Sequence, residues 1–190
     1  MSEYTRISGD IFTVAGFLTS REFSSYIALA ESLGFVGAPV NTVLGPQRRP
    51  DVRNDSRVML DDPERAADLW ARIRDYTPLN RRGWEAVGVY ERLRFYQYDR
   101  GQQFDWHHDG CFERDNGERS QLTYMIYLNE GFIGGETRFS ELQSTAPPES
   151  KVVPKTGLAL VFFHPLLHKG EVVTEGRRYV LRTDIMYKKQ

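Results

Sequence analysis

Two histidines and one aspartate have the residue types and the spacing of a metal site. His107 and Asp109 stand two residues apart in the stretch FDWHHDG, and His168 follows Asp109 by fifty-nine residues. Two neutral imidazoles and one carboxylate are the donor set that binds Fe(II) on one face of an octahedron and leaves three adjacent positions open. Arg178 lies ten residues after His168, where a guanidinium could anchor an acid bound to the metal. The pattern predicts an iron site that activates dioxygen.

The choice of ligands depends on the periodicity of a β-strand. Residues i and i+2 point to the same side of a strand, so His107 and Asp109 can reach one ion while His108 faces away. The distal ligand is either His164 or His168. His164 closes the apolar stretch LVFF, whereas His168 lies beyond the following turn, where the chain should return across the sheet. This position favours His168.

The elements that must position these residues divide into two groups, and the helical signals come first. Thr19-Ser20-Arg21-Glu22 has the form of a capping box, and apolar residues then recur at helical spacing until Gly34. A second helix is expected to begin at Asp61-Asp62-Pro63-Glu64, with proline near its first position, and to stop at Tyr76-Thr77-Pro78. Residues 56–60 are expected to form a short strand between the two helices.

From about Leu93 onward the pattern changes to short strands separated by glycine and proline. The stretches rich in β-branched and aromatic residues are LRFYQY, QLTYMIYL, ETRF, GLALVFF and RYVLRTDIMY. Strands without intervening helical patterns favour an antiparallel barrel or jelly roll over a parallel sheet. We therefore expect a single domain over residues 1–190, of the α+β, mainly β class. Its β core should span about 91–190, and the helices, within about 1–90, should pack on one face.

Composition excludes several classes of partner. The 25 Lys and Arg residues nearly balance the 26 Asp and Glu residues, so neither nucleic acid nor a membrane surface is an expected partner. No apolar stretch has the length that a bilayer requires, and the N-terminal residues MSEYTRISGD lack the pattern of a secretory signal. The one cysteine, Cys111, cannot form an internal disulfide. These features, and an iron that must stay ferrous, predict a cytoplasmic protein.

The chain resembles the prolyl-4-hydroxylase-like group of Fe(II)/2-oxoglutarate dioxygenases from about Arg92 to Tyr187. Several motifs carry the resemblance in the right order, which makes it far more specific than any one of them. They are Tyr98-x-x-Gly101-x-x-Phe104-x-x-His107-x-Asp109, Tyr127-Leu128-Asn129, Gly134-Gly135-Glu136-Thr137-x-Phe139, the V-x-P-x-x-G-x-A-x-x-F pattern from Val152 to Phe162, and finally His168 with Arg178. Arg53-Asn54-Asp55-Ser56-Arg57 also resembles a family segment that enters the core near the substrate groove.

This resemblance implies a double-stranded β-helix (jelly-roll or cupin-like) core and a set of cofactors. Fe(II) would be held by His107, Asp109 and His168, with 2-oxoglutarate chelating the metal, dioxygen as co-substrate and ascorbate as a reductant. The distal carboxylate of 2-oxoglutarate would pair with Arg178. The remaining cofactor-binding candidates are Tyr98, Tyr127 and Arg182, the last of which lies four residues after Arg178 and is the second choice of anchor.

The resemblance also implies the reaction, hydroxylation of an unactivated C–H bond with release of succinate and carbon dioxide. No side chain beyond the metal centre needs a catalytic role, because the cofactors carry the chemistry. The favoured substrate is a prolyl or other amino-acid residue in a protein or peptide, and Arg57, Arg94 and Trp106 are the candidates for contacting it. The alternatives are the same chemistry on a free amino acid or another small molecule, and a metal-dependent cupin-like enzyme that does not use 2-oxoglutarate.

Overall fold

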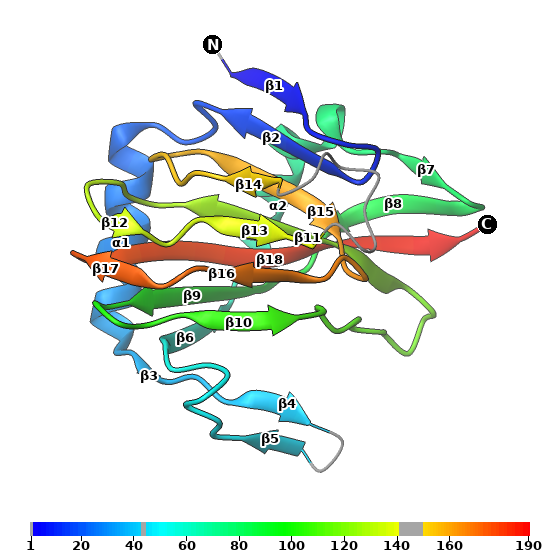
Figure 1. The fold of residues 1–190 in the computed structure, drawn as a ribbon. Helices are drawn as coiled ribbons and strands as arrows, with labels where there is room; N and C mark the ends of the chain where they lie inside the picture. Colours follow the sequence, from blue (N-terminus) through cyan, green and yellow to red (C-terminus); the bar gives the residue numbers. More distant parts are fainter. Residues whose placement is uncertain (1, 43–44, 141–149) are drawn as a thin grey trace.

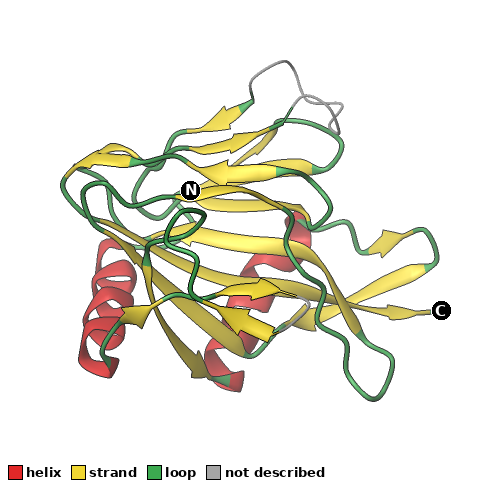
Figure 2. Cartoon of the chain, turned by 60° about the horizontal axis from the view of Figure 1, so that its bottom comes forward, coloured by secondary structure: helices red, strands yellow, loops and turns green. Residues whose placement is uncertain are grey.

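Two β-sheets face each other, and two helices cover the outer side of the larger sheet (Figure 1). The structure is a computed structural model, and it describes residues 2–42, 45–140 and 150–190. Figure 2 shows both helices on the same side of the strands. The expected class, mainly β with a jelly-roll core and helices on one face, is confirmed.

The larger sheet contains ten strands among the described residues and is antiparallel in every pairing. Along its main path the order is β1-β2-β15-β11-β18-β9-β6-β3, and β8 adds to β18 and pairs with β7. The strands are β1 (Glu3–Arg6), β2 (Ile11–Ala15), β3 (Val36–Gly37), β6 (Ser56–Asp61), β7 (Asn80–Arg81), β8 (Trp84–Val89), β9 (Arg92–Tyr98), β11 (Arg119–Tyr127), β15 (Ala159–Phe163) and β18 (Arg178–Lys189).

The smaller sheet carries the two histidines of the expected metal site. Its order is β10-β16-β13-β14, with β10 (Phe104–His107), β13 (Thr137–Phe139), β14 (Lys151–Val152) and β16 (His168–Gly170). Two further antiparallel pairs join β12 (Ile133–Gly134) to β17 (Val173–Glu175), and β4 (Val40–Thr42) to β5 (Gly45–Gln47). Figure 1 shows the β4–β5 hairpin extending away from the two sheets.

Both helices begin where the sequence predicts, and the first also ends there, whereas the second ends at Ile73 and only a 3₁₀ turn reaches the expected stop at Tyr76. Helix α1 (Ser20–Leu33) has Thr19 as its N-cap, with both hydrogen bonds of the capping box, and it ends at Gly34, whose φ is 82°. Helix α2 (Pro63–Ile73) has Asp62 as its N-cap and proline in its first turn, and the short 3₁₀ helix η1 (Arg74–Tyr76) follows it. Neither these helices nor any other described helix has the length and apolar character needed to span a bilayer.

Alternation along the strands of the larger sheet builds two separate apolar layers. On β9, Leu93 and Phe95 pack in the layer that contains the helices, whereas Tyr96 and Tyr98 pack in the layer between the sheets. Strand β18 divides in the same way, because Leu181 faces the helices while Val180 faces the smaller sheet. Since Arg178 and Arg182 are two residues from Val180 on either side, both project between the sheets.

The first ninety residues contribute more than a helical cover. Strands β1 and β2 extend the larger sheet beyond β15, and β6 pairs with β9 over its whole length. Strand β8 pairs with β18. The N-terminal half therefore supplies strands at both sides of the larger sheet as well as the helices on its outer face.

The capping box of α1 gives a first testable prediction. The Arg72 guanidinium and the Thr19 backbone hold the pKa of Glu22 at about 2, below its usual value of 4.5. A lowered pKa in the folded state stabilises the fold above pH 4.5, and this stabilisation is lost as the pH falls toward 2. Glu22→Gln should therefore lower the free energy of unfolding by about 1 kcal/mol near pH 7, since solvent screens this surface pair.

Urea unfolding of Glu22→Gln and the parent chain near pH 7 and again near pH 3.5 measures this difference. The difference in the free energy of unfolding between Glu22→Gln and the parent should be smaller near pH 3.5 than near pH 7. The exposed Glu3 on β1 provides the matched control Glu3→Gln, which should change neither value. A difference that stays constant with pH would show that the charge of Glu22 has no part in stabilising α1.

Candidate metal centre

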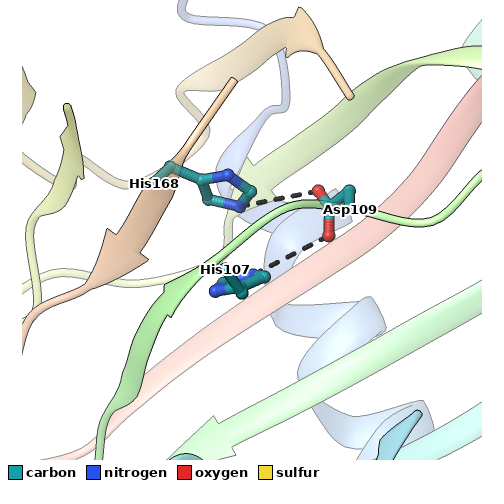
Figure 3. Close-up of side chains that lie close together, drawn as sticks. All are labelled: His107, Asp109 and His168. Carbon is teal, nitrogen blue, oxygen red and sulfur yellow. Dashed lines mark ion pairs between the residues drawn. The ribbon is translucent and has the colours of Figure 1, made fainter. Parts of the chain in front are cut away.

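The side chains of His107, Asp109 and His168 converge on one point (Figure 3). One ligand atom from each lies within 4.8 Å of the other two. Nε2 of His107 is 3.8 Å from Oδ1 of Asp109, and Nε2 of His168 is 3.5 Å from Oδ2. The two histidines are register partners in the pairing of β10 with β16, and Asp109 follows two residues after the end of β10. The strand pairing thus joins parts of the chain that are far apart in sequence.

Both histidines are held in the tautomer that leaves Nε2 available to a metal. The Nδ1–H group of His107 donates to the Asp105 carbonyl at 2.7 Å, and that of His168 donates to the Leu166 carbonyl at 2.9 Å. A carbonyl oxygen only accepts, so the proton of each neutral ring must be on Nδ1. The lone pair of each Nε2 is therefore free, and both lone pairs face Asp109. Backbone partners of this kind commonly orient histidine ligands.

The protonation states also suit a metal centre. Burial lowers the pKa of His107 to about 3, with a further contribution from His168, and burial likewise lowers the pKa of His168. Burial alone would raise the pKa of Asp109, but the Arg182 guanidinium and the neighbouring histidines outweigh it and hold that pKa well below its usual range. The site therefore offers two neutral imidazoles and one carboxylate, the donor set of ferrous iron.

Each oxygen of the Asp109 carboxylate has a protein partner. Oδ2 accepts a hydrogen bond from the Thr123 hydroxyl at 2.5 Å, and Oδ1 lies 3.1 Å from Nη2 of Arg182. Arg182 also pairs with Asp184 at 3.2 Å, and Asp184 pairs in turn with Arg94 at 3.0 Å. The Asp109 side chain is thus fixed on both sides by residues of the larger sheet.

His108 and His164 do not join this group. Nδ1–H of His108 donates to the Pro165 carbonyl at 3.0 Å, and the residue is exposed. His164 is buried and is held by two hydroxyl groups, those of Thr123 and Ser120. Of the two candidates for the distal position, His168 is therefore the one that lies with His107 and Asp109.

A cavity of about 420 Å³ of empty space, its open mouth included, connects this centre to Arg178. Arg178 is 2% exposed, and its guanidinium lies 4.8 Å from the centre of the Tyr98 ring and 5.4 Å from that of Tyr127. Within the described residues, its Nε and Nη1 are buried without a hydrogen-bond partner. Because buried donors are nearly always paired, this guanidinium fits an acceptor that the protein itself does not supply.

Small residues leave room around Arg178. A Cβ atom on Gly170, two residues after His168 on β16, would approach Nη1 of Arg178 to 3.2 Å. A Cβ atom on Gly135, where φ is +70°, would approach its Cδ to 3.1 Å. The Tyr127 hydroxyl is hydrogen-bonded to Thr137 at 2.7 Å, so Tyr127 presents its ring to the guanidinium. Of the two expected tyrosines, Tyr98 lines the cavity, together with Arg182.

The three candidates for substrate contact lie outside the cavity lining formed by the described residues. Arg94 is in the ion pair with Asp184. Trp106 is 40% exposed and packs against the Lys169 ammonium group, on the opposite side of β10 from His107. Arg57 is half-buried on β6, opposite Tyr96.

Two residues that the sequence analysis quoted only within motifs, Arg53 and Phe104, complete the cavity. Arg53 lines it and forms a two-pronged, buried ion pair with Asp55 at 2.6 and 3.0 Å. The Arg53 guanidinium lies 4.3 Å from the centre of the Phe104 ring, which stacks on His107 at 3.5 Å. Phe104 thus fixes the plane of the His107 ring. The Arg-x-Asp spacing in an extended segment could have indicated the pair, because residues two apart share a face.

Comparison with known proteins shows a similarity to one enzyme family. Residues 93–183 match the model of the 2OG-Fe(II) oxygenase superfamily. A putative prolyl 4-hydroxylase of Acanthamoeba polyphaga mimivirus is 34% identical over 108 residues, covering 47% of this chain and 42% of the viral protein. Prolyl 4-hydroxylase 2 of Arabidopsis thaliana is 28% identical over an alignment covering 88% of this chain and 64% of the plant protein. The chain therefore spans less than two thirds of the length of either relative.

Solved structures agree with the fold. A Pseudomonas putida prolyl-4-hydroxylase has a TM-score of 0.66 at 19% identity, covering 95% of this chain and 93% of the other. A Trichoplax adhaerens prolyl hydroxylase, solved with a hypoxia inducible factor peptide fragment, has a TM-score of 0.68 at 16% identity and covers 93% and 83%. The match of residues 93–183 and the His-Asp-His group make this chain similar to the prolyl-4-hydroxylase-like enzymes of the 2OG-Fe(II) oxygenase superfamily.

Proposed function

We propose that the protein is an Fe(II)- and 2-oxoglutarate-dependent dioxygenase that hydroxylates an unactivated C–H bond of a prolyl or other amino-acid residue in a protein or peptide. The observation that carries the proposal is the cavity that joins a His-Asp-His group to a buried arginine with unpartnered donors. Bound iron, 2-oxoglutarate and dioxygen would supply the oxidation, with release of succinate and carbon dioxide and with ascorbate as reductant. The protein supplies ligation, orientation and a shielded site.

Each residue of the cavity has a role in this proposal. His107, Asp109 and His168 would hold the metal through their free lone pairs. Arg178 would bind the distal carboxylate of 2-oxoglutarate, for which a planar two-pronged donor is well suited. Tyr98 and Tyr127 stack against the Arg178 guanidinium and limit its movement. Arg182 is already paired with two carboxylates, so we assign it to Asp109 rather than to the cofactor's distal end.

A peptide substrate is proposed from the relatives. The curated relatives are named prolyl 4-hydroxylases, and the Trichoplax adhaerens enzyme was solved with a peptide fragment. Incubation of the iron-loaded protein with proline-containing peptides and with free proline, followed by mass spectrometry, separates this substrate class from a free amino acid. A mass gain of one oxygen atom on the free amino acid alone would overturn it. A cytoplasmic location, which keeps the iron ferrous, is part of the same proposal.

The chemistry is tested by adding 2-oxoglutarate to the Fe(II) protein without oxygen. Chelation of the metal by the keto acid should produce a visible metal-to-ligand charge-transfer band, and admission of oxygen should then yield succinate. A metal-dependent cupin-like enzyme that does not use 2-oxoglutarate would bind iron but give neither signal. Absence of the band in the wild-type protein would overturn the assignment of the cofactor.

A further inference from the structure

His164 is a buried histidine that the proposed function leaves without a role. It is 3% exposed and lies in the turn directly after β15. Its Nδ1 lies 2.9 Å from the Thr123 hydroxyl, and its Nε2 lies 3.0 Å from the Ser120 hydroxyl. Both hydroxyls come from β11, whose register shifts between Ser120 and Leu122. This bulge lets residues three apart in sequence face the same ring.

The donor and the acceptor of each hydrogen bond can be assigned in turn, starting from the Asp109 carboxylate. The Asp109 carboxylate can only accept, so the single proton of the Thr123 hydroxyl is donated to its Oδ2 at 2.5 Å. The Thr123 oxygen must then accept from His164, which places a proton on Nδ1. A neutral imidazole with its proton on Nδ1 carries a lone pair on Nε2. That lone pair accepts the proton of the Ser120 hydroxyl.

At the end of these hydrogen bonds that is farther from Asp109, Ser120 is held by the backbone of Phe112. The Ser120 hydroxyl oxygen accepts from the Phe112 N–H at 2.9 Å, and the Ser120 N–H donates to the Phe112 carbonyl at 2.8 Å. Oδ1 of Asp184 faces Nε2 of His164 at 4.0 Å, too far for a hydrogen bond, and is paired with Arg182. From the Phe112 N–H through the side chains of Ser120, His164 and Thr123 to Asp109, each hydrogen bond therefore has its donor on the Phe112 side.

We propose that His164 is a positioning residue of the metal centre, which acts through Thr123 to fix the Asp109 carboxylate for metal binding. The inference rests on the proposed function, because it takes Asp109 to be a ligand. A hydroxyl hydrogen rotates to suit its acceptors, and the His164 donor removes that freedom from Thr123. Partners of this kind change metal affinity by about 10- to 100-fold when they are removed.

Mn²⁺ binding to the full chain, measured by electron paramagnetic resonance without 2-oxoglutarate, tests the inference apart from turnover. Thr123→Val removes the hydroxyl at nearly constant volume and should weaken Mn²⁺ binding by about 10- to 100-fold, and His164→Phe should do the same. The matched controls keep the donors. Thr123→Ser retains the hydroxyl, and the amide N–H of His164→Asn can replace Nδ1–H, so both should bind Mn²⁺ nearly as the parent does.

The double variant Thr123→Val/His164→Phe should bind Mn²⁺ no more weakly than Thr123→Val alone, since residues that act through one another are not additive. Additive losses would overturn the inference, as would unchanged affinity in Thr123→Val. If Asp109→Ala abolishes Mn²⁺ binding while the Thr123 and His164 variants bind Mn²⁺ like the parent, the proposed metal centre is supported and the positioning role of His164 is wrong. If Asp109→Ala binds Mn²⁺ like the parent, the proposed centre itself is wrong, and the inference falls with it.

The tautomer of His164 can be read without any metal. Long-range ¹H–¹⁵N correlation spectra of the metal-free protein should show the His164 proton on Nδ1, and the signal should persist in Ser120→Ala. A proton on Nε2 would reverse the direction of the hydrogen bonds from His164. This result would overturn the inference even if the protein binds metal as proposed.

Discussion

Replacement of Asp109 by alanine should abolish iron-dependent decarboxylation of 2-oxoglutarate, and His107→Ala should do the same. Each change removes one of the three proposed protein ligands, whereas even loss of an outer partner costs about 10- to 100-fold in affinity or activity. We therefore expect losses of more than about 100-fold in either variant. Succinate released per iron-loaded protein measures the effect, with circular dichroism to confirm that each variant is folded.

His108→Ala is the matched control, because this histidine is the immediate neighbour of His107. Its Nδ1–H donates to the Pro165 carbonyl, and its side chain does not enter the group formed by His107, Asp109 and His168. Most of the activity should therefore remain. An equal loss in His108→Ala would mean that the ligands were assigned to the wrong side of β10.

Strand periodicity predicted this part of the site from a few residues. The i, i+2 relation predicted that His107 and Asp109 lie together, and they do so even though β10 ends at His107. The choice between His164 and His168 was harder. It depends on which residue pairs with β10, and the register of β16 opposite β10 is a long-range property that local patterns do not contain.

For Arg182, local sequence patterns predicted the face of the strand but not the ion-pair partners. Its position on the same face as Arg178 was predictable, because the two residues are four apart on one strand. Its partners were not predictable. Asp109 follows β10 in sequence, and its position beside Arg182 depends on how the smaller sheet packs over β18. The strands β1 and β2 were missed for a related reason. Their place beyond β15 depends on a distant partner, and the helical signals of the first ninety residues were stronger.

The hydrogen bonds around His164 also depend on tertiary structure. Ser120 and Thr123 are three apart in sequence, so strict alternation would place them on opposite faces of β11. The bulge in that strand reverses this expectation. A bulge of this kind has no clear sequence signature here, which explains why His164 could be weighed only as a possible ligand.

Arg178→Ala should weaken 2-oxoglutarate binding by about 100- to 1000-fold while leaving metal binding almost intact. A hydrogen bond to a charged group contributes about 1.5–3 kcal/mol, and a planar guanidinium can make two of them to one carboxylate. A loss of about 3–4 kcal/mol corresponds to that range of affinities. The charge-transfer band of the Fe(II) protein should appear only at correspondingly higher 2-oxoglutarate concentrations, whereas the Mn²⁺ affinity measured without the keto acid should be close to that of the parent.

Arg177 supplies a control one residue away in the chain. Its guanidinium pairs with Asp99 at 2.5 Å near the surface, so Arg177→Ala removes the same charge without entering the cavity. It should leave the dependence of the band on 2-oxoglutarate unchanged, and Arg178→Lys should recover part of the binding because one cation remains. If Arg178→Ala and Arg177→Ala behave alike, the unpartnered donors of Arg178 do not bind the cofactor. Loss of binding in Arg182→Met but not in Arg178→Ala would transfer that role to Arg182.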